Sequence, residues 1–395
     1  MGADGLASLS SSRLAIVIKA VTGPGGSMNI GSHIYWLFAG IPLLSAGLIL
    51  LLAWPARRLG LVDHPSTRKH HPHPVPLVGG LAIWAAFTVG MLLKPNKLPD
   101  YGFLLGGMTL MALVGFLDDI RPISHWVRLL FQILAVLVMG LADQVVLSNL
   151  GNLFGSGDIL LAHGAWLFTL FAVVGLINAL NMTDGLDGLA GGQALLTTGW
   201  LMFLCLQAPI CIAARLESLL VLALAIAGFL VFNLRHPWRA RASVFMGDAG
   251  STLLGYVLAW FLIRMSQGEA RALDPITAVW ILALPLMDTV VVMIRRLMAG
   301  HSPFAADRQH LHFLLLGYGL SDARAVASLL LIAFGLGGVG VLAQWFGVPE
   351  DVRFYAFVVI FLLYFAMTTR MVQVLRNRLV IGTQDRRRIS APTSS

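Results

Sequence analysis

Two adjacent carboxylates, Asp118 and Asp119, directly follow a long apolar run of this sequence. Neighbouring carboxylates at the edge of an apolar segment repel each other, so the pair needs a divalent metal or a cationic side chain nearby. Arg121 is close enough in the sequence to be a purely structural counter-ion. We favour a functional role, because carboxylates at the ends of apolar segments usually have a partner or a task.

A second polar segment, residues 178–192, carries Asn181, Asp184 and Asp187. Glycine follows each of the two aspartates and allows tight turns and close approach of a ligand. Amide and carboxylate oxygens at these spacings suit magnesium. A turn capped by Asn and Asp side chains is the rival interpretation for this segment taken alone.

Two further aspartates stand at expected helix positions. Asp248 lies between glycines at the start of a helix, where backbone N–H groups favour an anion, although an N-cap role alone would also account for it. Asp288 lies within an apolar run and is equally compatible with a helix contact and with a function.

The loop after residue 60 combines Asp63 with the cations Arg68 and Lys69, and prolines hold it extended. Ordinary positive charge on a membrane loop would explain the cations, whereas the three clustered histidines of this loop favour an anion site.

A later loop contains Asp307, Arg308, His310 and His312. A lone His-x-His is weak support for a metal site, because structural zinc needs further nitrogen or sulfur ligands. Beside Arg308, the pair is better explained as part of a diphosphate-binding loop.

The composition indicates which class of protein carries these polar residues. Hydrophobic residues make up 57% and charged residues 12% of the 395 residues, whereas a soluble domain carries about 25% charged residues. This composition excludes a disordered chain and a soluble nucleic-acid binder, and two cysteines cannot form a disulfide framework. The net charge of +8 is typical of basic loops that face anionic lipid. The sequence therefore predicts an all-α integral membrane protein.

A membrane-spanning helix needs about 20 mostly apolar residues, and this window predicts about eleven spans. An odd number puts the termini on opposite sides, and most Lys and Arg residues follow odd-numbered spans, so we expect the N-terminus outside and the C-terminus in the cytoplasm. The predicted spans are 34–54, 78–93, 102–117, 126–142, 160–177, 189–206, 218–233, 250–265, 275–294, 325–345 and 353–374.

Three parts make up the predicted organisation. Residues 1–33 form a leader that we expect to be disordered, and Met28 within it is an alternative start. Residues 34–375 form the polytopic domain, and residues 376–395 form a basic cytoplasmic tail. The carboxylate-bearing loops fall on the cytoplasmic side, where we expect them to assemble one site.

Taken together and in this order, the motifs resemble those of the polyprenyl-phosphate N-acetylhexosamine-1-phosphate transferase family, over residues 35–375. The segments that carry the resemblance are 61–65, 76–80, 118–119, 178–192, 244–252 and 302–310. One position departs from the family pattern, because Phe313 replaces the last histidine of the ninth loop.

The resemblance implies a magnesium enzyme, with manganese as the alternative metal, and it implies a role for each matching residue. Asp118, Asp119 and His310 would be catalytic; Asp248 and Asn181 would bind the metal; Asp184, Asp187, Gly188, Arg296, Asp307, Arg308 and His312 would bind the nucleotide and sugar; Asp63, Arg68 and Lys69 would bind the lipid phosphate.

The implied reaction transfers GlcNAc-1-phosphate from UDP-GlcNAc to undecaprenyl phosphate, releases UMP, and starts O-antigen or a related polysaccharide at the bacterial inner membrane. Another UDP-HexNAc or UDP-MurNAc-pentapeptide is the alternative donor, and a homodimer is left open. The rival from another class is an ion-coupled transporter, which would carry acids near span midpoints. Except for Asp288, the candidate acids here are at the cytoplasmic ends of the predicted spans.

Overall fold

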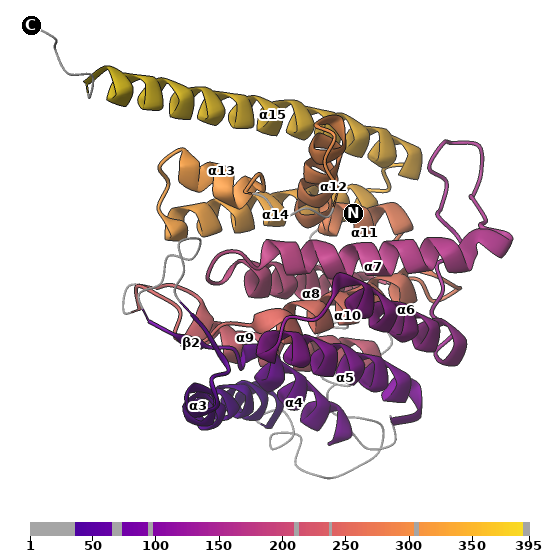
Figure 1. Ribbon diagram of the computed structural model, residues 1–395. Helices are drawn as coiled ribbons and strands as arrows, with labels where there is room; N and C mark the ends of the chain where they lie inside the picture. Colours follow the sequence, from indigo (N-terminus) through magenta and orange to yellow (C-terminus); the bar gives the residue numbers. More distant parts are fainter. Residues whose placement is uncertain are drawn as a thin grey trace, which may run out of the picture.

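The computed structural model describes residues 36–64, 73–93, 98–208, 213–236, 239–303 and 308–389. Almost all of this chain is helical, and many of the helices lie alongside one another (Figure 1). The helices are η1 Trp36–Gly40, α3 Ile41–Leu59, α4 Gly79–Leu92, α5 Leu98–Ile120, α6 His125–Ala142, η2 Ala162–Gly164, α7 Ala165–Thr183, α8 Leu189–Gln207, α9 Ala213–Asn233, α10 Gly247–Ser266, α11 Pro275–Ile281, α12 Ala283–Met298, α13 Leu311–Gly317, α14 Asp322–Trp345 and α15 Glu350–Ile389; the strands are β1 Val62–Asp63 and β2 Val75–Pro76.

The prediction of a multi-pass helical membrane protein is confirmed. Within the described residues, nine helices are long and apolar enough to cross a membrane, and the bent pair α11–α12 makes ten if it counts as one span. Helix α4 is apolar but has only 14 residues. The leader 1–33 and the end of the tail lie outside the described residues.

The ninth predicted span, residues 275–294, is not one continuous helix. It is broken between α11 and α12, which are bent by 80°, and Leu282 at the break has φ −100° and ψ 13°. Pro285 explains the break, because its ring crowds the carbonyl four residues earlier, at Ile281, and it lacks an N–H to donate.

Helix α10 lies at the centre of the helices and packs against α4, α5, α7 and α8. Small residues let the backbones approach closely, as in other membrane helix pairs. A Cβ on Gly80 of α4 would overlap the backbone of Gly250, and one on Gly115 of α5 would overlap the backbone of Ala249. These contacts fix the N-terminal end of α10 against two neighbouring helices.

A short ribbon ties the first loop to the same end of α10. Strands β1 and β2 pair antiparallel, with Val62 opposite Pro76 and Asp63 opposite Val75. The N–H of Phe245 donates to the Pro76 carbonyl over 2.9 Å, and the N–H of Gly79 donates to the Phe245 carbonyl over 3.0 Å. The segment before α10 is therefore held by residues that come long before it in the chain.

At the opposite end of the helices, a buried ion pair joins α15 to the start of α11. Arg353 Nη2 donates to Asp274 Oδ2 over 2.6 Å, and Arg353 Nη1 donates to Thr277 Oγ1 over 2.6 Å. Glu350 accepts from the N–H of Asn152 over 3.2 Å. These contacts anchor the beginning of α15, the yellow helix that runs along one side of the molecule (Figure 1).

Candidate active site

Asp119, the second carboxylate of the adjacent pair, caps helix α10. Its two oxygens accept from the backbone N–H groups of Asp248 at 2.9 Å and Ala249 at 3.2 Å. Gly247, just before them, has φ +73°, a conformation that favours glycine. The end of α5 and the start of α10 are thereby joined through one side chain.

Arg128, in the first turns of α6, bridges the other carboxylates. Its Nη1 lies 2.8 Å from Asp118 Oδ2 and 3.5 Å from Asp248 Oδ2. Asp118 Oδ1 also accepts from the N–H of Ile123 over 2.8 Å. The counter-ion of the acidic pair is therefore Arg128, whereas the sequence suggested Arg121.

Asn181, near the end of α7, faces Asp248. Its amide Nδ2 donates to Asp248 Oδ1 over 2.7 Å and to Ser251 Oγ over 2.8 Å. The amide oxygen of Asn181 accepts no hydrogen bond from the described residues. Asn181 and Asp248, the two metal ligands that the resemblance implies, are therefore adjacent.

Asp184 lies in the turn after α7 and accepts no hydrogen bond from the described residues. Burial raises the pKa of Asp184 to about 7, and the carboxylates of Asp248, Asp119 and Asp187 add to that shift. The aspartates of three separate loops therefore act electrostatically as one cluster.

Asp187 and Gly188 form hydrogen bonds with other residues of the protein. Asp187 Oδ2 accepts from Arg235 Nε at 2.7 Å and from the N–H of Ala242 at 3.1 Å. The N–H of Gly188 donates to Asn233 Oδ1 over 2.8 Å, and Gly188 has φ +84°. These two residues shape the turn that presents Asp184.

The ninth loop contacts the same turn through His312. The His312 ring is buried, and a Cβ on Gly185 would overlap it. Burial lowers the pKa of His312 to about 4; His310 adds to that shift and Asp288 opposes it. His312 is therefore a neutral ring packed on Gly185 at physiological pH, and it does not act as a cation.

Arg296 and Arg308 differ in their surroundings. Arg296 is buried, and its Nη1 donates to the Pro303 carbonyl over 2.6 Å. The guanidinium of Arg308 lies 5.8 Å from the centre of the Phe313 ring, within the range of a cation–π contact. Phe313, the departure from the family pattern, therefore packs against a residue that the family resemblance places at the diphosphate.

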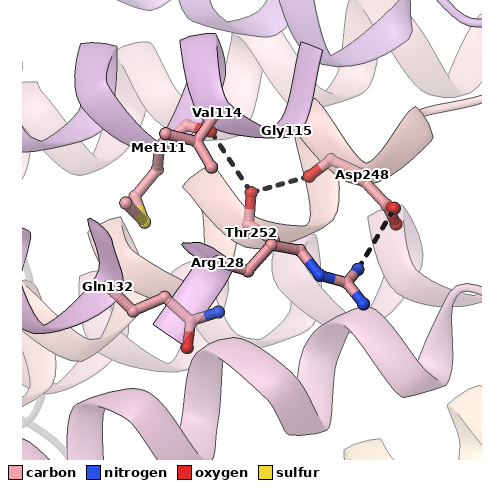
Figure 2. Close-up of a pocket in the computed structure, with 7 residues that line it drawn as sticks. All are labelled: Met111, Val114, Gly115, Arg128, Gln132, Asp248 and Thr252. Carbon is pink, nitrogen blue, oxygen red and sulfur yellow. Dashed lines mark hydrogen bonds and ion pairs between the residues drawn. The ribbon is translucent and has the colours of Figure 1, made fainter. Parts of the chain in front are cut away.

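A small pocket lies between α5, α6 and α10, beside Arg128 and Asp248. Figure 2 shows both side chains, with Gln132 of α6 further along the same wall. The other lining residues are Met111, Val114, Gly115 and Thr252. The pocket therefore borders the acidic cluster at one end and apolar side chains along its sides.

Three of the predicted site residues, Asp307, Arg68 and Lys69, lie outside the described residues. Asp63 lies in β1, on the ribbon tied to the segment before α10. Arg128 and Arg235 also belong to the site, although the sequence alone did not single them out. Their signal was present but weak, because each is a basic residue in a loop-proximal turn, like many others in a membrane protein.

The acidic cluster carries oxygen donors of the kind that magnesium uses. Within the described residues, no three carboxylate, imidazole or thiolate side chains converge to enclose a metal alone. Magnesium in phosphate-transfer sites is usually held by one or two carboxylates, with substrate phosphates and waters completing its shell. Asp248, the Asn181 amide oxygen and the unbonded Asp184 carboxylate match that donor set.

Comparison with known proteins decides the family. Residues 101–266 match the model of glycosyl transferase family 4. The chain is 39% identical to an undecaprenyl-phosphate alpha-N-acetylglucosaminyl 1-phosphate transferase of Escherichia coli K12. The aligned 313 residues cover 78% of this chain and 84% of that relative. The chain belongs to glycosyl transferase family 4.

Relatives with the same name in other organisms agree with this family assignment. The Yersinia pestis protein is 37% identical over 338 residues, covering 85% of this chain and 91% of the relative. The Haemophilus influenzae protein is 34% identical over 339 residues, covering 85% of this chain and 94% of the relative. The family that the motifs predicted is confirmed, and the carboxylates at the start of α10 lie within the matched region of glycosyl transferase family 4.

Proposed function

We propose that this protein transfers GlcNAc-1-phosphate from UDP-GlcNAc to undecaprenyl phosphate and releases UMP. Its relatives are named undecaprenyl-phosphate alpha-N-acetylglucosaminyl 1-phosphate transferases. One observation carries the proposal: Asp118, Asp119, Asn181 and Asp248 come from three helices and meet at the N-terminal end of α10. A cluster of carboxylates can hold a divalent cation, and a reaction between two anionic phosphates needs positive charge between them.

The main barrier to this reaction is the repulsion between the two phosphates. A phosphate monoester has a second pKa of about 6, so the lipid phosphate is already mostly dianionic at neutral pH. Asp248 and Asn181 would hold a magnesium ion, which supplies positive charge to the phosphates. Arg128 and Arg308 add two cations, and Lys69 a third.

We further propose that the lipid phosphate attacks the sugar-bearing phosphorus directly and in line. The contacts of the acidic pair support this scheme, because both oxygens of Asp119 accept backbone N–H groups and Asp118 is paired with Arg128 and Ile123. Carboxylates held in this way organise the site and are poor nucleophiles. The competing scheme forms an aspartyl-phosphate on one of them.

Stereochemistry separates the two schemes. One displacement inverts an isotopically chiral phosphorus, whereas two displacements retain its configuration. Retention, or release of one equivalent of UMP from enzyme and UDP-sugar without lipid, would overturn direct attack.

A panel of labelled UDP-sugars tests the donor. Membranes containing the protein should transfer label from UDP-GlcNAc to the lipid in a magnesium-dependent way, with manganese as the second metal to assay. Transfer from UDP-MurNAc-pentapeptide or another UDP-HexNAc, without transfer from UDP-GlcNAc, would assign the donor differently.

The same proposal includes the orientation of the protein. We propose eleven spans in the inner membrane, with the N-terminus outside, the C-terminus and acidic cluster at the cytoplasmic face, and a product that starts O-antigen or a related polysaccharide. The distribution of Lys and Arg supports this orientation. Cysteine labelling from each side of sealed vesicles tests it.

A further inference from the structure

Asp288 of α12 is the hub of a buried hydrogen-bond network beside the ninth loop. Its Oδ2 lies 2.8 Å from His310 Nδ1. Its Oδ1 accepts from the N–H of Leu311 at 2.9 Å and from the hydroxyl of Tyr364 at 2.8 Å. One carboxylate therefore joins α12, the ninth loop and α15.

The network determines which nitrogen of His310 carries a proton. An ionised carboxylate only accepts hydrogen bonds, so His310 Nδ1 must donate to Asp288. In a neutral ring, Nε2 is then unprotonated and can only accept. Arg295 holds the same segment in place, because its Nη2 donates to the carbonyl of Gln309 over 2.7 Å, next to His310.

The same network fixes where the ring lies. His310 stacks on His312, with ring centroids 5.8 Å apart and planes at 12°. His312 in turn packs on Gly185, one residue after Asp184. Asp288 therefore sets the position of a histidine one ring away from the turn that carries Asp184.

We propose that Asp288 is a positioning residue that holds His310 as the neutral Nδ1–H tautomer, so that Nε2 accepts a hydrogen bond from a hydroxyl or amide N–H of the sugar. This inference rests on the proposed transferase function. It assigns His310 to the donor groups of the sugar, whereas a cationic histidine would bind the diphosphate oxygens. Tyr364 completes the site from the C-terminal helix, far along the sequence.

The decisive substitution is Asp288→Asn. The amide nitrogen of Asn donates a hydrogen bond, so His310 Nδ1 is expected to become the acceptor and the proton to move to Nε2. Loss of the group that orients a metal-bound histidine typically lowers metal affinity or activity by about 10–100-fold. We expect a fall of that size in kcat/KM for UDP-GlcNAc, and no further fall when Asp288→Asn is added to His310→Ala.

Two further variants separate positioning from folding. Tyr364→Phe keeps the ring and removes one of the three donors, so it should lower kcat/KM by only a few-fold and preserve the His310 tautomer. Asp274→Asn is the matched control, because Asp274 also tethers α15 through a buried side chain, Arg353, at the other end of the molecule. It should lower thermal stability and leave the tautomer unchanged.

The readouts are the ¹⁵N chemical shifts of the His310 ring in the purified full-length protein and steady-state kinetics with UDP-GlcNAc. A wild-type ring that is doubly protonated, or protonated only at Nε2, would overturn the inference. So would independent, multiplicative effects of Asp288→Asn and His310→Ala on kcat/KM. If the wild type transfers no sugar phosphate at all, the proposed function fails, while the ring shifts still decide the role of Asp288.

Discussion

The carboxylate of Asp119 binds the backbone of Asp248: the two residues are 129 positions apart, and the N–H of one donates to the side chain of the other over 2.9 Å. Two of the acidic residues are thus not equivalent ligands of one site. Asp119 holds the helix end from which the Asp248 side chain projects.

This relationship predicts that Asp119→Ala lowers the stability of the fold by releasing the N-terminal end of α10, whereas Asp118→Ala releases only the contacts to Ile123 and Arg128. Removing an N-cap costs about 0.5–2 kcal/mol, and α10 lies at the centre of the fold. Asp119→Asn keeps one acceptor oxygen and should lose less. Thermal unfolding in detergent measures the difference, and equal melting temperatures for wild type and Asp119→Ala would contradict the capping role.

Arg128 is predicted to compete with magnesium for the same carboxylates, because it lies 2.8 Å from Asp118 and 3.5 Å from Asp248. Arg128→Gln should therefore lower the magnesium concentration needed for half-maximal activity. The same change should lower kcat by about 10²–10³, the range seen when one stabilising donor is removed. Arg121→Gln is the control and should change neither quantity. An increased magnesium requirement in Arg128→Gln would contradict the competition.

Because the pKa of His312 is lowered, we predict that this residue makes the fold less stable on acidification. Its pKa is about 4 in the folded protein and 6.5 in an ordinary environment, so the unfolded chain binds more protons between these values. Stability is full above about pH 6.5 and falls as the pH drops toward 4, by roughly 3 kcal/mol at most. The raised pKa of Asp184 acts in the opposite direction over this range, so the test is the difference between two proteins. Acidification from pH 7.5 to pH 5 should change the free energy of unfolding of the wild type less favourably than that of His312→Gln. Identical pH profiles would mean that His312 is not the group responsible.

Gly185→Ala tests the contact between the turn after α7 and the ninth loop. A Cβ there would overlap the His312 ring, so the loop should shift and activity should fall while the helices remain folded. Gly175→Ala is the matched control, because no atom lies within 4 Å of the Cβ it would add. Full activity in Gly185→Ala would show that the two loops need not touch during turnover.

The sequence predicts a site residue best where polar residues of one kind recur at the ends of several apolar spans. Asp118, Asp119, Asn181 and Asp248 were expected on one face, and the structure brings them together, because alternate span ends return to the same side. Arg128 and Tyr364 were not predicted, because a basic residue in a helical turn and a tyrosine in an apolar helix have many equally good structural explanations. Their roles depend on distances between helices, which no spacing along the chain encodes. The break at Leu282 could have been predicted from Pro285.

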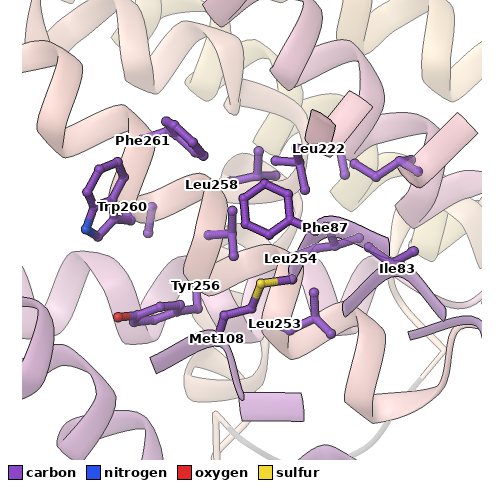
Figure 3. Close-up of a cluster of buried hydrophobic side chains, with 14 of the residues drawn as sticks. Ile83, Phe87, Met108, Leu222, Leu253, Leu254, Tyr256, Leu258, Trp260 and Phe261 are labelled. Carbon is purple, nitrogen blue, oxygen red and sulfur yellow. The ribbon is translucent and has the colours of Figure 1, made fainter. Parts of the chain in front are cut away.

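Helix α10 is the most deeply buried of the nine long apolar helices in the described part of the chain, with 94% of its apolar segment buried. Its mean hydropathy of 1.2 is nevertheless the lowest of the nine. Figure 3 shows its side chains Leu253, Leu254 and Leu258 interleaved with Phe87 and Met108 of α4 and α5. Such a helix would be only weakly stable in lipid alone, so its insertion depends on packing against its neighbouring helices. Helices α4, α5, α7 and α8 all precede α10 in the chain. During synthesis, the ribosome therefore completes the surrounding helices before it releases the segment that fills them, and the acidic cluster can assemble only when that late segment arrives.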